Sequence, residues 1–188
     1  MNKIDDILYG FLLIKATFDP SIKKLYLSND KYLEARKEYM RIIKTSDRTI
    51  RNKVDKMIFL GYISKGSNRL IFTQEHSAWE YVKYDMLKYL VATKSERSIK
   101  VYTYLLNKFK WKQNDPQGYS FTLKELALAC GYSETSASTG AASIFRLIVE
   151  DLARTGVINF KTYNDGKSSR MRLIWVEQEY EKLKPVGQ

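Results

Sequence analysis

The stretch TSDRTIRNKVDKMIFLGYISKGSNRLIFT, residues 45–73, carries signals for the start, the buried face and the end of a helix. Ser46 is a favourable N-cap, because its hydroxyl can accept a hydrogen bond from the free amides of the first helical turn. Ile50, Val54 and Met57 then fall on one helical face, and Gly61 can end the helix. The stretch therefore begins with an amphipathic helix.

Two strand-like segments follow this helix directly. Residues 62–64 and 69–73 are rich in β-branched, aromatic and other apolar side chains, and the polar turn KGSN joins them without an acidic residue. The combination predicts a hairpin immediately after a capped helix.

The elements before residue 45 complete a recognisable order. They are a helix over 4–18, a short strand over 25–27, and a helix over 31–44 capped by Asn29 or Asp30. Helix, short strand, helix, turn, helix and hairpin in this order are typical of a winged helix-turn-helix domain, which we expect over residues 1–74.

The second half of the chain repeats the same order. We expect a helix over 95–111, a strand over 119–121, a helix opened by the capping box of Thr122 and Glu125, a turn over 130–133, a helix to Gly156, and a hairpin over 157–176. The halves align at an offset of 95 residues: Ile50 with Phe145, Arg51 with Arg146, Val54 with Val149, Met57 with Leu152, Gly61 with Gly156, and Ile63 with Ile158. We therefore predict a second winged helix over residues 95–188.

The serines that begin the last helix of each half do not fit this offset. Ser46 and Ser133 are only 87 residues apart, so the second half has eight extra residues in this region. Its recognition helix is therefore either about two turns longer or restarts after Gly140, and the sequence leaves both open.

Residues 75–94, between the halves, have helical apolar spacing and balanced charge. They predict a connecting helix, which either packs between the two halves or serves in dimerisation. The predicted fold class is thus α+β and mainly α, with two winged helix-turn-helix domains in tandem joined by a helix.

The chain is strongly basic, and the excess charge is concentrated. The net charge is +11 at pH 7, and residues 21–73 contain thirteen Lys or Arg against five Asp or Glu. An excess of this kind attracts polyanions such as nucleic acid. Its clustering favours a binding face in the first half of the chain.

Polar side chains of the helix after Ser46 point away from its apolar face. Arg48 and Asn52 are of the types that read guanine and adenine edges in the major groove, while Arg51 and Lys53 suit phosphates. The candidate DNA contacts of the first half are Ser46, Arg48, Thr49, Arg51, Asn52, Lys53 and Lys56 on the helix, and Lys65, Asn68 and Arg69 on the hairpin.

The equivalent face of the second half is smaller and less charged, since residues 121–156 hold three basic residues against four acidic ones. Its polar side chains are expected to face away from Ile144, Ile148 and Leu152. The candidate DNA contacts here are Thr135, Thr139, Ser143 and Arg146 on the helix, and Lys161, Lys167, Arg170 and Arg172 on the hairpin. The alternative in both halves is a solvated basic surface without a ligand.

Other kinds of site are disfavoured by composition. With Cys130 as the one cysteine and His76 as the one histidine, neither an intramolecular disulfide nor a Cys- or His-based metal cluster is expected. The motifs of phosphate-binding loops, serine hydrolases and zinc proteases are missing. We expect no catalytic residue, no cofactor and no metal. The sequence shows no signal peptide or transmembrane span, which predicts a cytoplasmic protein that does not bind membranes.

Three segments of the second half carry a family resemblance: YLVATKSERSIKVYTYLLNKFK, FTLKELALACGYS and IFRLIVEDLARTGVINF. Over residues 89–176 the chain resembles the winged-helix domains of replication initiators and replication-associated proteins of Gram-positive plasmids and phages. The resemblance implies binding to repeated DNA sites through the second recognition helix and the wing around 167–172. The chain departs from that family in having its strongest charge in the first half and in lacking an ATPase module.

The sequence thus predicts a sequence-specific double-stranded DNA-binding protein of a mobile element, associated with nucleoid or plasmid and acting in replication initiation or its control. The alternatives are a winged-helix transcriptional regulator, a protein-interaction module in a replication, segregation or conjugation complex, and an RNA binder. RNA is disfavoured because its A-form major groove is too narrow for a helix. A second copy of the chain and replication or segregation proteins are further candidate partners.

Overall fold

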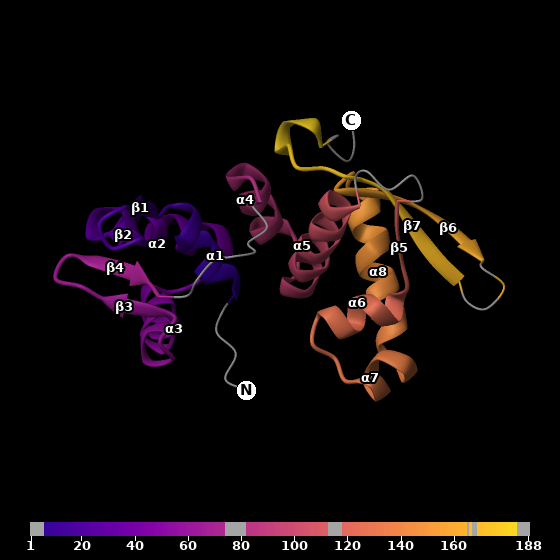
Figure 1. Ribbon diagram of the computed structural model, residues 1–188, viewed down its shortest axis with the longest axis horizontal. Helices are drawn as coiled ribbons and strands as arrows, with labels where there is room; N and C mark the ends of the chain where they lie inside the picture. Colours follow the sequence, from indigo (N-terminus) through magenta and orange to yellow (C-terminus); the bar gives the residue numbers. More distant parts are fainter. Residues whose placement is uncertain (1–5, 74–81, 113–117, 165, 167–168, 184–188) are drawn as a thin grey trace. The chain divides into compact units, whose positions relative to one another are not determined.

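The computed structural model describes residues 6–73, 82–112, 118–164, 166 and 169–183. The chain divides into two compact units, Met1–Trp79 and Glu80–Gln188, each with helices against a small antiparallel sheet (Figure 1). The fold is α+β and mainly α, with eight α-helices among the described residues. Each of these helices is too short or too polar to cross a lipid bilayer.

The first unit folds as three helices and a four-stranded sheet within its described residues. Its elements are α1 (Asp6–Ile14), β1 (Thr17–Asp19), β2 (Lys24–Ser28), α2 (Asn29–Ile43), α3 (Asp47–Phe59), β3 (Ile63–Lys65) and β4 (Arg69–Phe72). The strands are antiparallel and lie in the order β1-β2-β4-β3.

Local signals explain where α3 begins and ends. The Ser46 hydroxyl accepts a hydrogen bond from an amide of the first turn at 3.2 Å, which confirms Ser46 as the N-cap. At the other end the amides of Gly61 and Tyr62 donate to the carbonyls of Ile58 and Met57, and Gly61 has φ +75°. This pair of bonds ends the helix at a left-handed residue, a conformation that costs glycine little.

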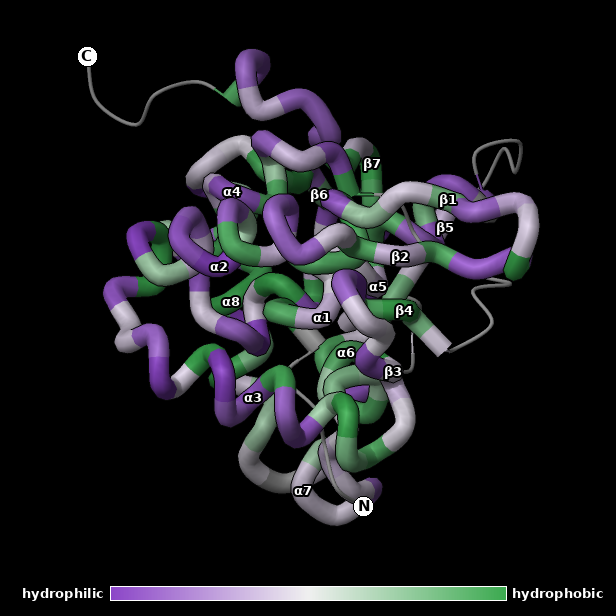
Figure 2. The backbone as a smooth tube through the Cα atoms, turned by 90° about the vertical axis from the view of Figure 1, so that its left-hand side faces the viewer, coloured by the Kyte–Doolittle hydropathy of each residue, from purple (hydrophilic) through white to green (hydrophobic). Residues whose placement is uncertain are grey.

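An apolar core joins the helices of the first unit to its sheet. The fully buried side chains include Leu8, Phe11 and Leu12 of α1, Leu27 of β2, Ala35 of α2, Ile50 and Met57 of α3, Ile63 of β3 and Phe72 of β4. Hydrophilic and hydrophobic stretches alternate along α3, as an amphipathic helix requires (Figure 2). One face of α3 is therefore fixed in the core and the other is left outside.

The second unit has a related order, with one more helix at its start, a single strand before its third helix, and two helices instead of one before its final hairpin. Its elements are α4 (Tyr84–Thr93), α5 (Glu96–Trp111), β5 (Tyr119–Phe121), α6 (Leu123–Ala129), α7 (Glu134–Thr139), α8 (Ala141–Arg154), β6 (Ile158–Asn164), β7 (Ser169–Val176) and the 3₁₀ turn η1 (Tyr180–Lys182). The antiparallel sheet has the order β5-β7-β6. Helix α8 packs against α5, α6 and β6, and its Phe145 and Leu152 are fully buried.

Two predictions for the second unit are confirmed in detail. The Thr122 hydroxyl accepts from the Glu125 amide at 3.2 Å, and the Glu125 carboxylate accepts from the Thr122 amide at 2.6 Å, so the capping box is complete. The hairpin expected after Gly156 is β6–β7.

Two boundaries predicted for the first unit are wrong. The helix expected over 4–18 ends at Ile14, and Thr17–Asp19 instead form β1, which pairs with β2. Helix α2 is capped by Ser28, whose hydroxyl accepts an amide of the first turn at 3.4 Å, and not by either of the two residues that follow it.

The sequence left two forms of the last helix of the second half open, and the structure has the interrupted one. Gly140, with φ −137° and ψ −22°, separates α7 from α8. Residues 74–81 of the predicted connecting helix lie outside the described residues. The remainder of that helix starts at Tyr84, as α4, and packs against α5 and η1.

Candidate nucleic-acid interface

The outward face of α3 carries side chains that the fold itself does not use. Arg48, Asn52, Asp55 and Lys56 are all exposed, opposite the buried Ile50, Val54 and Met57 of the same helix. Within the described part of the chain, the side chains of Arg48, Asn52 and Lys56 take part in no hydrogen bond or ion pair. Their spacing places them along one stripe of the helix. This stripe offers guanidinium, ammonium and amide donors to whatever lies against it.

Other candidates on α3 are already engaged within the first unit. The hydroxyls of Ser46 and Thr49 are 2.8 Å apart, and Ser46 also serves as the N-cap. Arg51 pairs with Asp47 at 2.6 Å, and Asp47 pairs in turn with Arg36 of α2 at 2.8 Å. These contacts fix the start of α3 on α2.

Lys53, the remaining candidate of α3, is half-buried, whereas Lys56 is exposed. Lys53 was expected on the flank of the polar stripe, and its intermediate burial agrees with a place at the edge of the exposed face.

The β3–β4 hairpin holds three candidates in different settings. Lys65 and Asn68 are exposed at its tip. Arg69 pairs with Asp19 of β1 at 2.9 Å and lies over the ring of Tyr26, with 5.3 Å from the guanidinium carbon to the ring centroid. Arg69 therefore holds the sheet together, and Lys65 is the exposed cation of this hairpin.

The surroundings of Asp19 favour the charged carboxylate that this ion pair requires. Hydrogen bonds from the Ser21 hydroxyl and amide, and then the guanidinium of Arg69, hold the pKa of Asp19 below its usual range. The charged form that Arg69 needs is thus maintained.

The candidates on the last helices of the second unit are divided between two helices. Because the helix breaks at Gly140, Thr135 lies on α7 and Ser143 and Arg146 lie on α8. Thr139 ends α7, and its side chain is outside the described residues. The Ser143 hydroxyl donates to the Gly140 carbonyl at 3.3 Å.

The outward face of α8 is mixed in character, because apolar, acidic and basic side chains are all exposed on it. Leu147 is 67 % exposed, and Glu150 is exposed on the same side of the helix. Ile144 was expected in the core but is 38 % exposed. Arg146, which is exposed on α8, lines a cavity of about 160 Å³ between α8 and the β6–β7 hairpin. This volume is smaller than that of most cofactor sites.

The β6–β7 hairpin presents basic side chains on its outer face. Lys161 and Arg172 are directly opposite in the register and both exposed, an arrangement of like charges that destabilises a sheet unless an anion is present. Arg172 also lies over the ring of Tyr163, and Arg170 is 3.6 Å from Glu125 of α6. Lys167 lies outside the described residues.

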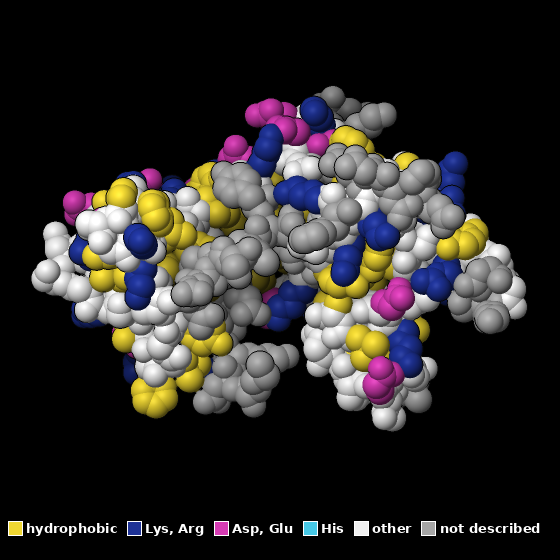
Figure 3. All heavy atoms as spheres, in the orientation of Figure 1, with side chains coloured by type: hydrophobic (Ala, Val, Ile, Leu, Met, Phe, Trp, Pro, Cys, Tyr) yellow, Lys and Arg dark blue, Asp and Glu magenta, His cyan; other side chains and the backbone are white. Residues whose placement is uncertain are grey.

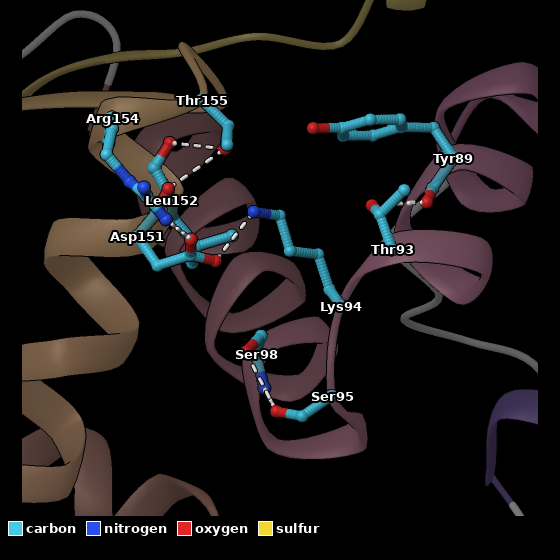
Figure 4. Close-up of polar contacts among 9 residues, drawn as sticks. All are labelled: Tyr89, Thr93, Lys94, Ser95, Ser98, Asp151, Leu152, Arg154 and Thr155. Carbon is cyan, nitrogen blue, oxygen red and sulfur yellow. Dashed lines mark hydrogen bonds and ion pairs between the residues drawn. The ribbon is translucent and has the colours of Figure 1, made fainter. Parts of the chain in front are cut away.

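A partly buried ion pair fixes the C-terminal end of α8 (Figure 4). Lys94, whose side chain is 5 % exposed, reaches Asp151 at 2.6 Å, and Arg154 contacts the same carboxylate at 2.8 Å. Burial raises the pKa of Asp151, but the hydrogen bonds from Lys94 and Arg154 outweigh this effect and leave the pKa lowered. Asp151 is therefore held as a carboxylate.

Among the described residues, no group of three His, Cys, Asp or Glu side chains could hold a metal ion. Burial raises the pKa of Tyr9 to about 12 and also raises the pKa values of Tyr102 and Tyr119. A raised pKa opposes the phenolate form that a tyrosine nucleophile requires.

Sequence reasoning missed Phe59, the last residue of α3. Its side chain is 86 % exposed and follows Asn52 by seven residues on the same helical stripe. The signal was present in this spacing, because continuing the polar stripe past Lys56 leads to Phe59. Figure 3 shows that hydrophobic and basic side chains both reach the surface of the first unit.

Comparison of the chain with protein-family models, with curated proteins and with solved structures finds no match.

Proposed function

We propose that this chain is a tandem winged helix-turn-helix protein that binds double-stranded DNA in a sequence-specific manner, with α3 as its principal reading helix. The observation that carries the proposal is the stripe of Arg48, Asn52 and Lys56, exposed and unused by the fold. A helix fixed by its apolar face, with an open face of this composition, has the chemistry needed in the major groove.

The hairpins supply the complementary phosphate contacts in this proposal. Lys65 extends the basic surface of the first unit, and the opposed pair Lys161 and Arg172 does so in the second. Phosphate contacts of this kind set affinity and register, while base contacts set sequence preference. The protein acts without catalysis or cofactor.

The resemblance over residues 89–176 supports a role in replication initiation or its control on a plasmid or phage. A transcriptional regulator would use the same interface. The two roles differ in their DNA sites, since an initiator binds an array of origin repeats and a regulator binds sites that overlap promoters.

Binding of a selected duplex tests the proposal. Arg48→Ala and Asn52→Ala are each expected to cost about 1–3 kcal/mol of binding free energy and to relax sequence preference. Lys37→Ala is the matched control, because Lys37 is an exposed cation on α2 of the same unit, and it should weaken binding much less. Unchanged affinity in both α3 variants, measured by gel shift over a series of salt concentrations, would remove α3 as the reading helix.

A second candidate function concerns the second unit alone. The exposed Leu147 beside Glu150 favours protein contact over base reading on α8. Dimerisation through this face predicts a dimer in sedimentation experiments that Leu147→Asp converts to monomer. If the wild-type chain is a monomer, dimerisation through the exposed face of α8 is excluded.

A further inference from the structure

The most exposed large apolar side chain among the described residues is Phe59, at 86 %. Burying a phenylalanine ring is among the larger hydrophobic gains open to a single side chain, and the first unit does not make use of it. Phe59 ends α3, just before the helix stops at Gly61. Its ring is therefore available to a ligand that lies along α3.

The neighbours of this ring on α3 are polar. Asn52, Asp55, Lys56 and Phe59 have the spacing i, i+3, i+4, i+7 and are all exposed. Homeodomains read the major groove with four helix residues of the same spacing. A duplex placed against the polar stripe would meet the Phe59 ring at the C-terminal end of that stripe.

We propose that Phe59 determines specificity by contacting the C5-methyl group of a thymine in the major groove. This inference rests on the proposed function and deepens it. The thymine methyl is the apolar group that the major groove presents, and an aromatic ring suits it. Asp55, between Asn52 and Phe59, has the acceptor oxygens that suit the amino group of cytosine.

The helix geometry also gives the position of this thymine. Asn52 and Phe59 are separated by about 10 Å along the axis of α3. That distance equals about three base-pair steps of the duplex. The bound site should therefore contain an adenine read by Asn52 and a thymine about three base pairs away.

A protein partner explains the ring less well. Asp55 and Lys56 border Phe59, whereas the core of a protein interface is depleted in charged residues. In a duplex, Lys56 suits the phosphates, Asp55 suits the amino group of a cytosine, and the ring suits a methyl group.

The test removes only that methyl group. The full-length chain selects duplexes from a random-sequence pool, and each thymine of the selected site is then replaced singly by deoxyuridine. For the wild-type chain, one replacement should weaken binding about fourfold, the effect of one buried methyl group. Phe59→Ala should bind the thymine and deoxyuridine duplexes with equal affinity.

Phe18→Ala is the matched control, because Phe18 of β1 is also exposed, at 57 %, and lies in the same unit. It should retain the fourfold discrimination. The inference is overturned if the wild-type chain is indifferent to every replacement, or if Phe59→Ala discriminates as well as the wild type. It is also overturned if Phe59→Ala instead changes the sedimentation of the free chain.

Failure of this inference is distinguishable from failure of the proposed function. A chain that selects a site and loses affinity on Arg48→Ala, but ignores the methyl group, refutes the role of Phe59 alone. A chain that selects no duplex at low salt refutes both.

Discussion

Helices α3 and α8 end in the same hydrogen-bonded turn yet present different surfaces. The amides of Tyr62 and Val157 donate to carbonyls five residues earlier at 2.9 Å, and Gly61 and Gly156 both have φ +75°. The core-facing pairs Ile50 and Phe145, Val54 and Val149, and Met57 and Leu152 are each no more than 3 % exposed. Position by position, the buried sides of the two helices correspond at the offset of 95.

The outer faces do not correspond. At the same offset, Arg48 is replaced by Ser143, Asn52 by Leu147, and Phe59 by Arg154. The buried sides of α3 and α8 are therefore alike, and their exposed sides differ in charge and in the position of their apolar residues.

The largest effects should come from the shared side. Ile50→Ala is expected to lower the free energy of unfolding by about 2–5 kcal/mol and Phe145→Ala by about 3–5 kcal/mol, because each leaves a cavity at a fully buried site. Denaturant unfolding measures the loss, and hydrogen exchange should increase mainly in the unit that carries the substitution. If either substitution lowers the free energy of unfolding by less than about 1 kcal/mol, the two positions do not have equivalent roles in their cores.

The two helices are anchored at opposite ends, which gives a second prediction. Asp47 at the start of α3 pairs with Arg36, and Asp151 in the last turn of α8 pairs with Lys94. Lys94→Met should cost about 1–3 kcal/mol at pH 7, because the carboxylate loses a charged hydrogen bond. Arg154→Met, which removes a more exposed partner, should cost less.

The pH dependence of this pair has a defined sign. The pKa of Asp151 is lowered in the folded chain, so its pairing adds stability above the usual aspartate pKa of 3.8 and loses that contribution as the pH falls through the folded value. The stability difference between the wild-type chain and Lys94→Met should therefore be constant near neutrality and shrink below about pH 4. A difference independent of pH down to acid unfolding would contradict the role of Asp151.

Local signals made most of this fold predictable. Ser46, the capping box at Thr122 and the glycine at position 61 each specify a helix end within one turn of chain, so their helices were found. Strand β1 was missed because the helix before it was extended to Phe18; the three-residue strand pairs with β2, and its Asp19 pairs with Arg69 fifty residues on.

The candidate site was less predictable than the fold. Periodicity gives the direction of a helical face but not the width of the buried arc, so Ile144 was expected in the core and lies partly outside. The break at Gly140 was left open, since an interior glycine costs only about 1 kcal/mol of helix propensity and tertiary contacts decide. Phe59 was missed because the polar face was followed only as far as Lys56.

The smallest expected effect concerns the turn between α2 and α3 in the first unit and the turn between α6 and α7 in the second. In the second unit Gly131 takes the left-handed conformation with φ 85°, but in the first unit Lys44 does so with φ 50°. The left-handed conformation costs a non-glycine residue about 1–2 kcal/mol of folded-state stability. Glycine removes this strain, but it also has more conformational freedom in the unfolded chain, which cancels part of the gain. Lys44→Gly should therefore stabilise the chain by about 0.5–1 kcal/mol, and Gly131→Ala should destabilise it by about 1 kcal/mol.

Urea unfolding of both variants checks this prediction, with Thr45→Gly as the control, because Thr45 has no left-handed backbone to relieve. Thr45→Gly should lose stability. Lys44 is exposed in the most basic part of the chain. If its charge contributes to DNA binding, this contribution explains why a lysine occupies a strained left-handed position. Lys44→Gly should then raise stability while lowering affinity for the selected duplex less than tenfold, and equal affinity would leave the strain without a functional cause.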